Sequence, residues 1–222
     1  MQEINWFGAL PKQSRPEILK ARATIPDEQR KTLSKFGKEY FDDKTVYSYG
    51  GYYYDGRFKS VARKMVEHYG LNENSKILDI GCAKGFLLYE FFKFGIRGVY
   101  GLDISEYAIE HVPDAIKENC YVGTASDLSR WPDNFFDFVI SKDALHNLPT
   151  GEAEKSITEI IRISKGPAFL QINSYRTPKE KKHLTDWLVA IKTVWSVEEW
   201  LTLYSTNDYQ GDYYFLTFNE DI

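Results

Sequence analysis

The residues with the clearest chemical spacing form a glycine-containing loop that is followed by an acid. Residues 77–86 read ILDIGCAKGF, so Gly81 and Gly85 stand between a short apolar run and a helical pattern. Glycines in such a turn let the backbone approach a ligand closely. Asp103 ends the next apolar run, where a carboxylate can accept the hydroxyls of a ribose. The pair favours a nucleoside-containing ligand over an ordinary turn followed by a helix-capping acid.

Two classes of nucleotide ligand compete for this loop. The dinucleotide fingerprint Gly-x-Gly-x-x-Gly/Ala would require small residues at positions where this chain has Gly81, Ala83 and Phe86. The large side chain of Phe86 would prevent the close packing of helix on strand that the third glycine permits. The sequence therefore disfavours a nicotinamide-dependent oxidoreductase.

The elements around the loop follow a regular alternation. Short apolar runs cover residues 76–80, 99–104, 119–122, 135–141, 168–172 and 213–218. Helical patterns cover residues 26–41, 58–69, 86–94, 106–117, 152–163 and 178–191. Short apolar strands that alternate with helices are typical of an α/β fold, in which helices cover both faces of a parallel sheet.

Several helix ends carry recognisable signals. Ser105 is placed to cap the helix that follows it, and Asp55 and Gly70 are placed to begin and end the helix between them. Ser196 and Glu199 have the spacing of a capping box.

The sequence D-I-G-C-A-K-G at residues 79–85 resembles the D/E-x-G-x-G-x-G motif of class I S-adenosylmethionine (SAM)-dependent methyltransferases, with Ala83 where that family usually has glycine. Three further segments resemble the family in the same order. They are GTASDL at residues 123–128, PDNFFDFVIS at 132–141 and DALHNL at 143–148. The resemblance covers residues 57–172. It implies a Rossmann-like sheet of seven strands, mostly parallel, with helices on both faces and an antiparallel final strand.

The resemblance also implies a methyl donor, SAM, with S-adenosylhomocysteine as its product. Asp79, Gly81 and Gly85 would shape the site for the amino-acid portion of the donor, and Asp103 would hold the ribose. The remaining positions of this set are Ile104 on the adenine face, Asp127 and Leu128 at the adenine edge, and Cys82, Ala83 and Ser141. Plain core packing is the alternative for Ile104 and Leu128.

Cys82 could be a nucleophile by residue type, but its position in the loop favours a small buried apolar group. The chain has two cysteines, which form neither a disulfide framework nor a zinc-ligand set. No spacing of acids suggests magnesium, so no metal is predicted.

His146 is the candidate general base, because it follows a strand end in the segment that resembles the methyl-donor loop of the family. A side-chain pKa near neutrality suits proton abstraction. Lys142 and Asp143 are alternatives, and Lys142 could instead orient an anionic substrate. A structural loop histidine is the simpler interpretation of His146.

Aromatic residues make up 16% of the chain and gather in two flanking segments, residues 40–58 and 187–218. Residues 1–56 are predicted to be an N-terminal arm with an aromatic lid segment. Residues 57–222 are predicted to form the methyltransferase domain with C-terminal elements that shape the substrate site, giving a single domain overall. Candidate lid residues are Tyr49, Tyr53 and Arg57, since aromatic faces suit a sulfonium cation and arginine suits a carboxylate or phosphate. The alternative is that the tyrosines pack the arm onto the sheet and that Arg57 is a surface charge.

Composition excludes several classes. The net charge of −4, without a basic stripe, argues against a nucleic-acid partner. No apolar run approaches the length of a membrane helix, and the first residues lack the pattern of a signal peptide, so a cytoplasmic protein is expected. We expect a monomer or homodimer with a small-molecule substrate.

The predicted function is therefore transfer of a methyl group from SAM to a small polar acceptor, at oxygen, with a sugar- or phosphate-containing metabolite as one option. The alternatives are an N-methyltransferase, a protein methyltransferase, or a non-catalytic module that binds SAM. Fold does not determine the acceptor.

Overall fold

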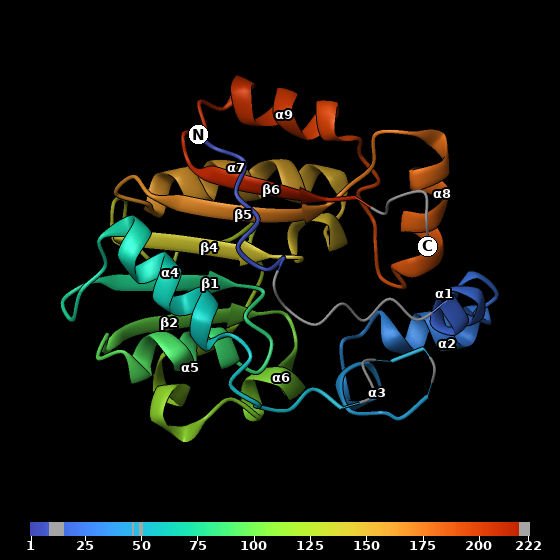
Figure 1. The fold of residues 1–222 in the computed structure, drawn as a ribbon, viewed down its shortest axis with the longest axis horizontal. Helices are drawn as coiled ribbons and strands as arrows, with labels where there is room; N and C mark the ends of the chain where they lie inside the picture. The colour runs from blue at the N-terminus through green and yellow to red at the C-terminus, as the bar shows by residue number, and fades with distance from the viewer. Residues whose placement is uncertain (9–15, 46, 49–50, 218–222) are drawn as a thin grey trace.

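The computed structural model describes residues 1–8, 16–45, 47–48 and 51–217. Within these residues six strands form one sheet in the order β3-β2-β1-β4-β5-β6 (Figure 1). The strands are β1 (Lys76–Ile80), β2 (Gly98–Asp103), β3 (Cys120–Val122), β4 (Phe138–Lys142), β5 (Ala168–Asn173) and β6 (Asp212–Leu216). The α/β, Rossmann-like sheet with helices on both faces is confirmed.

Nine α-helices and two short 3-10 helices accompany the strands in the described part of the chain. The α-helices are α1 (Pro16–Ala23), α2 (Asp27–Leu33), α3 (Lys38–Phe41), α4 (Lys59–Tyr69), α5 (Phe86–Lys93), α6 (Glu106–Glu110), α7 (Thr150–Ile163), α8 (Pro178–Trp187) and α9 (Val197–Thr206). The 3-10 helices are η1 (Asp114–Asn119) and η2 (Leu145–Asn147). In Figure 1, α1, α2, α3 and α8 stand beyond the carboxyl ends of the strands.

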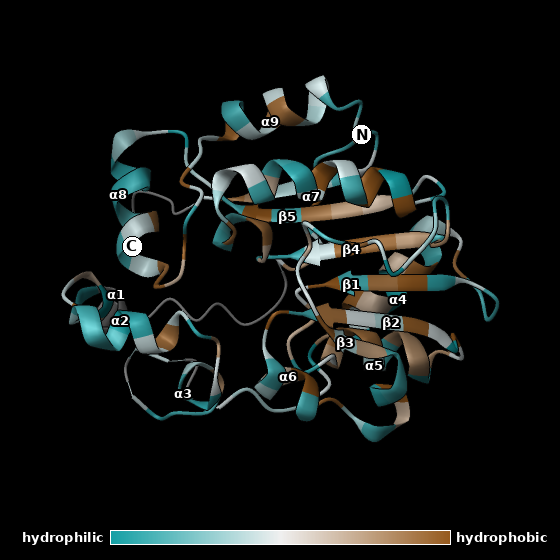
Figure 2. Cartoon of the chain, turned by 180° about the vertical axis from the view of Figure 1, so that it is seen from behind, coloured by the Kyte–Doolittle hydropathy of each residue, from teal (hydrophilic) through white to brown (hydrophobic). Residues whose placement is uncertain are grey.

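Neighbouring residues of each central strand point to opposite faces of the sheet. In β1, Ile77 packs with α4 and α5, whereas Leu78 packs with α7 and α9. In β5, Phe169 and Leu170 divide in the same way. This two-residue period makes both faces apolar. In Figure 2 the hydrophobic colouring accordingly gathers on the strands, while α1, α2 and α8 are largely hydrophilic.

The prediction of seven strands with an antiparallel last strand is not met. The described residues form six strands, and β6 pairs with β5 in parallel, from Phe169 opposite Asp212 to Asn173 opposite Leu216. The chain between the two strands passes through α8 and α9. A helical crossover of this length returns the chain to the same end of the sheet, so the next strand runs in the same direction.

Three predicted helices are shorter than expected by more than one residue. The helix expected over 178–191 ends at Trp187. The helix expected over 106–117 ends at Glu110, because Pro113 lacks a backbone N–H and disfavours helical geometry in the residue before it. The helix expected over 26–41 divides into α2 and α3 around Phe36, whose φ is 53°.

The predicted helix caps are formed at three of four sites. Ser105 accepts a hydrogen bond from Ala108 N, Gly70 ends α4 in the left-handed conformation, and Ser196 forms its capping box. Asp55 does not cap α4, because its carboxylate accepts hydrogen bonds from Arg57 instead.

The N-terminal residues cover the outer edge of β6. Ile4 N donates to Tyr213 O at 2.8 Å, and Tyr213 N donates to Gln2 O at 2.9 Å. An exposed strand edge invites pairing with other chains, so this contact protects it.

Candidate active site

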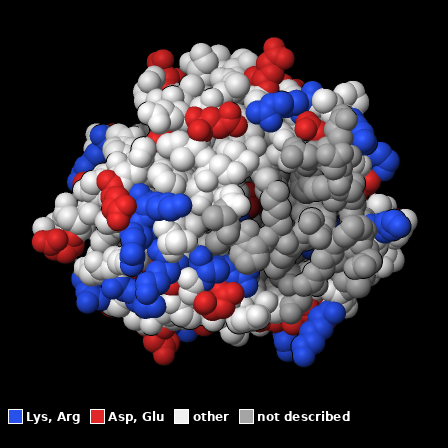
Figure 3. All heavy atoms as spheres, in the orientation of Figure 1, with Lys and Arg blue, Asp and Glu red and all other residues white. Residues whose placement is uncertain are grey.

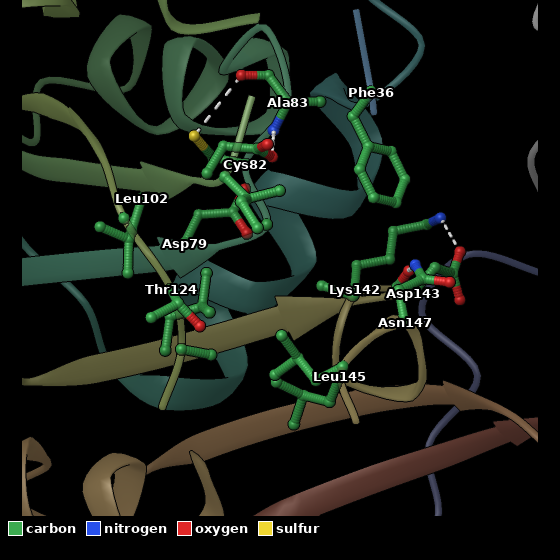
Figure 4. A pocket seen from close by; sticks show the side chains of 18 of the residues that line it. Phe36, Asp79, Cys82, Ala83, Leu102, Thr124, Lys142, Asp143, Leu145 and Asn147 are labelled. Carbon is green, nitrogen blue, oxygen red and sulfur yellow. Dashed lines mark hydrogen bonds and ion pairs between the residues drawn. The ribbon is translucent and has the colours of Figure 1, made fainter. Parts of the chain in front are cut away.

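A cavity of about 390 Å³ lies at the carboxyl ends of β1, β2 and β4. This is the usual position of a ligand site in an open parallel sheet. Figure 4 shows Asp79, Cys82 and Ala83 at one end of the cavity and Lys142, Asp143 and Asn147 at the other.

The glycine loop after β1 forms one wall of the cavity. Its backbone has positive φ at Gly81 (77°), Ala83 (50°) and Gly85 (67°). A Cβ atom on Gly81 would lie 2.3 Å from the Cβ of Ala144, so this position excludes any side chain. Ala83 adopts the left-handed conformation that a glycine would hold more easily.

Asp103 joins the loop to the end of β2. Its carboxylate accepts hydrogen bonds from Ala83 N at 2.7 Å and from Ser105 N at 2.9 Å, and burial raises its pKa. The next residue, Ile104, lines the cavity and is 56% exposed. A carboxylate beside an exposed apolar side chain fits a ribose attached to a flat base.

Asp79 carries the most unusual charge in the site. It is buried, lines the cavity, and its Oδ1 has no hydrogen-bond partner among the described residues. Burial and the nearby charge of Asp103 raise the pKa of Asp79 to about 7, against the opposing effect of Lys142. An unpaired buried carboxylate fits the ammonium group of an amino acid.

These residues together fit SAM. Asp79 would hold its ammonium group, Asp103 its ribose hydroxyls and Ile104 one face of its adenine. The donor, when bound, would supply a methyl group on a sulfonium.

Four residues predicted for the donor site lie outside the cavity lining. Gly85 stands at the start of α5 in the left-handed conformation, with a φ of 67°. Asp127 is exposed and accepts a hydrogen bond from Ser129 N, whereas Leu128 is buried in the core beneath α7. Ser141 is buried, and its hydroxyl donates to Ile80 O at 3.0 Å, which joins β4 to β1. Their roles toward the donor stay predictions. The cavity is lined instead by Gly123, Thr124 and Ala125, which belong to the same GTASDL segment as Asp127 and Leu128.

Cys82 lines the cavity with a thiol that is not poised to ionise. Its contact with the Cys120 thiol and its burial raise the pKa of Cys82 well above the usual value. Both cysteines are free and buried. This environment suits a neutral packing group rather than a thiolate nucleophile.

Lys142 and Asp143 both line the cavity and form an ion pair. The Asp143 carboxylate also accepts hydrogen bonds from Gln171 Nε2 and Asn173 Nδ2, each at 3.0 Å. Burial raises the pKa of Asp143, but the charge and hydrogen bond of Lys142 outweigh it and lower the pKa below its ordinary value. The structure therefore brings a fixed charged pair to the end of β4.

The structure does not bring His146 to the cavity. The residue is 1% exposed and is absent from the lining, and its Nδ1 accepts a 3.4 Å hydrogen bond from Asn173 N. Burial lowers the pKa of His146 to about 4, so the imidazole is neutral at physiological pH. The base role predicted for it has no support in this geometry.

The lid candidates take different positions. Tyr49 lies outside the described residues. Tyr53 is 66% exposed and does not line the cavity. Arg57 does line it, and its guanidinium is held by Asp55 at 2.7–2.9 Å.

Five aromatic residues line the cavity: Phe36, Tyr40, Phe41, Tyr52 and Phe58. All but Phe36 lie in the flank 40–58, whose aromatic concentration is visible in the sequence. We call the first four of these residues the aromatic wall. Phe36 lies just outside that flank, at the start of the run FGKEYF, and has no strand-end position to mark it as part of a site.

No helix of the described residues is long and apolar enough to span a membrane. The same residues hold no group of three or more His, Cys, Asp or Glu arranged to bind a metal ion.

A parallel sheet, a glycine loop and a ribose-type acid at one cavity define a Rossmann-like nucleoside-binding domain. Residues 78–170 match the family model described as "Methyltransferase domain". Residues 78–170 are thus similar to a methyltransferase domain, which agrees with the resemblance of residues 79–85 to the class I SAM-dependent motif.

Relatives with curated descriptions support this assignment. The chain is 30% identical over 125 residues to phosphoethanolamine N-methyltransferase of Plasmodium falciparum. The matched segment covers 54% of this chain and 47% of that protein. It is 31% identical over 122 residues to a sterol 24-C-methyltransferase of Aspergillus fumigatus. This match covers 49% of this chain and 30% of that protein. The matches therefore span less than half the length of these relatives.

Among solved structures, a SAM-dependent methyltransferase from Archaeoglobus fulgidus superimposes with a TM-score of 0.53. The alignment covers 68% of each chain at 19% sequence identity. This likeness supports the fold.

Proposed function

We propose that this chain transfers a methyl group from SAM to a small polar acceptor, at oxygen. The observation that carries the proposal is the unpaired, buried carboxylate of Asp79, which faces the same cavity as Asp103 and Ile104. The match of residues 78–170 to a methyltransferase domain supports the choice of donor.

The chain's own residues would contribute mainly orientation and exclusion of water. Asp79 and Asp103 hold the two polar ends of the donor, which fixes the direction in which its methyl group points. The aromatic wall lines the cavity, and its apolar rings would keep bulk water from the reacting atoms. Alignment of the reacting groups supplies a large part of the acceleration in a bimolecular displacement.

The choice of an oxygen acceptor rests on the charges beyond the donor site. Arg57, Lys142 and Lys192 all line the cavity, and cations at these positions disfavour a protonated amine. Asp143 can accept a hydroxyl proton, while the ammonium of Lys142 stabilises the developing oxyanion. Glu152 is a second carboxylate that lines the cavity outside the donor set.

Nitrogen, carbon and nucleic-acid acceptors have less support from the structure than an oxygen acceptor. The relatives' names include nitrogen and carbon acceptors, and the charges around this cavity favour neither. On the face seen in Figure 3, basic and acidic side chains are interspersed, which supports a small-molecule acceptor over a nucleic acid. A cytoplasmic location and a monomeric or homodimeric state stay predictions.

A ligand panel tests the donor. The melting temperature should rise with SAM and with S-adenosylhomocysteine and stay unchanged with NAD, because only a ligand that binds the native state stabilises it. Stabilisation by NAD alone would contradict the proposal.

Matched acceptors test the chemistry. Pairs of small molecules that differ only in hydroxyl or amino groups should be methylated, as judged by mass spectrometry, on the hydroxyl member. Asp143→Asn should then reduce kcat about 10²-fold or more with the affinity for SAM unchanged. Binding of SAM without methylation of any acceptor would favour a non-catalytic module.

A further inference from the structure

A buried ion pair connects the glycine loop to the segment that carries the aromatic wall. Lys84 lies between Ala83 and Gly85, and it is only 6% exposed. Its Nζ donates to both carboxylate oxygens of Asp42, at 2.6 and 2.8 Å. Asp42 directly follows α3, more than forty residues earlier in the chain.

Asp42 joins two further segments at the same carboxylate. The hydroxyl of Tyr107, in α6, donates to Oδ2 at 2.6 Å, and the backbone N of Tyr52 donates to Oδ1 at 3.1 Å. We call Asp42, Lys84, Tyr107 and the backbone of Tyr52 the Asp42 bridge. Partial burial raises the pKa of Asp42, but the hydrogen bonds from Lys84, Tyr107 and Tyr52 lower it below the ordinary value, so the carboxylate is ionised.

The bridge stands at the base of the aromatic wall. Phe41 stacks on Tyr107, with ring centroids 6.4 Å apart, and lies 6.0 Å from Tyr52. Tyr52 in turn stacks on Phe86, the first residue of α5, at 5.0 Å. Asp42 itself is not part of the cavity lining, so any effect on the ligand passes through its neighbours.

A second contact ties the wall to the ribose side of the site. The hydroxyl of Ser105 donates to the carbonyl oxygen of Phe36 at 2.5 Å. The backbone N of Ser105 donates to Asp103, which also binds the backbone N of Ala83, next to Lys84. One network of hydrogen bonds therefore connects the residues that would bind the donor with the residues that position the aromatic wall.

Given the proposed function, on which this inference rests, we propose that Asp42 is a positioning residue that couples donor binding to placement of the aromatic wall. A ligand that orders the glycine loop orders Lys84 and hence the bridge. By the reciprocity of linkage, a bridge that holds the wall in place strengthens donor binding by the same factor.

Two substitutions remove the bridge from its two sides. Asp42→Asn keeps the shape of the side chain and removes its charge. Lys84→Met keeps the aliphatic stem and removes the ammonium. Asp43→Asn is the matched control, because it makes the same change in net charge one residue along and its side chain takes no part in the bridge.

Donor affinity and local protection are measured together. Calorimetry gives the Kd for SAM, and tryptic cleavage after the exposed Lys44 reports the wall segment. In the wild type and in Asp43→Asn, SAM should slow this cleavage about tenfold. In Asp42→Asn and Lys84→Met, the Kd should rise about tenfold and the slowing should disappear. The double variant should lose no more than either single variant, because both remove the same interaction.

The outcomes separate this inference from the proposed function. If the wild type does not bind SAM, the proposed function fails. If the wild type binds SAM and Asp42→Asn keeps both affinity and protection, the inference fails alone. A raised Kd with unchanged protection would reduce Asp42 to a purely structural role and would also overturn it. If Asp42→Asn does not fold, Tyr107→Phe removes one bond of the bridge and should show the same two effects in smaller measure.

Discussion

Asp79 is the residue whose charge should make donor binding depend on pH. With its pKa at about 7, much of the carboxylate is protonated below neutrality and cannot pair with an ammonium. The affinity for SAM should therefore rise about eightfold between about pH 6 and about pH 7.5. Calorimetry across this range measures the change, and Asp79→Asn should remove the pH dependence while weakening binding.

The same carboxyl should affect the stability of the ligand-free protein in the opposite direction. The pKa of Asp79 is about 7 in the folded state and 3.8 in the ordinary, unfolded environment. Between about pH 4 and about pH 7, therefore, the carboxyl is protonated in the folded state and ionised in the unfolded state. The stability it contributes is full below about pH 4 and is lost as the pH rises through 7. At pH 8, Asp79→Asn should therefore melt higher than the wild type. A lower melting temperature would show that the carboxylate is paired.

Asp103 and Asp127 allow a direct comparison of two acids predicted for the donor. Asp103→Ala should raise the Kd for SAM at least tenfold, because it removes a charged acceptor of about 1.5–3 kcal/mol and frees Ala83 N. Asp127→Ala should change the Kd less than twofold, since the residue is exposed and outside the cavity lining. An equal rise of the Kd in the two variants would show that Asp127 contributes to donor binding as much as Asp103 does.

At the residue scale, the sequence predicted which residues stand near strand ends better than it predicted where their side chains point. Asp79 is the last residue but one of β1, and Asp103 is the last residue of β2. Parallel strand ends meet at one edge of the sheet, so their place at the cavity could be predicted. His146 also follows a strand, but the short helix η2 turns its ring toward Asn173 and away from the cavity. That turn depends on tertiary packing, which spacing does not reveal.

At the scale of elements, the glycine loop should respond in opposite ways to two single-methyl changes. Gly81→Ala places a Cβ 2.3 Å from that of Ala144 and at a φ of 77°, so it should lower the free energy of unfolding by about 2–4 kcal/mol. Ala83→Gly relieves a left-handed alanine and should give a net gain between zero and about 1 kcal/mol. Urea unfolding with and without SAM measures both changes.

Each variant of this pair is the control for the other, because the two sites lie in one loop and exchange the same two residue types. A loss of stability in Ala83→Gly as large as that in Gly81→Ala would mean that the loop requires the alanine methyl for packing.

Helix ends and strand positions followed from local chemistry, whereas strand direction did not. Gly70, Ser105 and Ser196 act as the helix signals predict, because capping involves only a few adjacent residues. The direction of β6 depends on how α8 and α9 cross the sheet edge after β5. The apolar pattern of residues 213–218 is the same for a parallel and an antiparallel strand.

At the scale of the whole molecule, the two aromatic flanks have different roles. The first flank supplies Tyr40, Phe41, Tyr52 and Phe58 to the cavity. The second flank mainly fills the core, since Trp200 and Tyr204 of α9 are fully buried in the apolar layer between this helix and the sheet. Aromatic content alone predicted a concentration near the site, but it could not separate side chains that line a cavity from side chains that fill a core.

The N-terminal helices meet the C-terminal half of the chain beyond the strand ends. A small cluster joins them, consisting of Ile25, Leu33, Val189 and Ala190. Arg22 Nη1 donates to Trp187 O at 3.1 Å, and the hydroxyl of Ser34 donates to Val189 O at 3.2 Å. We call α1, α2 and residues 187–190, which this cluster joins, the N-terminal cap. The cluster is separate from the two apolar layers of the sheet, so the cap is expected to unfold locally as a unit of its own.

Leu33→Ala should therefore loosen the cap and leave the sheet intact. Removing a fully buried leucine costs about 2–5 kcal/mol, and the small cluster around Leu33 has few other contacts to offset the loss. Hydrogen exchange followed by mass spectrometry should show faster exchange in α2 and in residues 187–190, with β4 unchanged. SAM should partly restore protection to α2, because the chain that follows it carries the aromatic wall. Equal acceleration in β4 would contradict this account, since it would show that cap and sheet unfold as one cooperative unit.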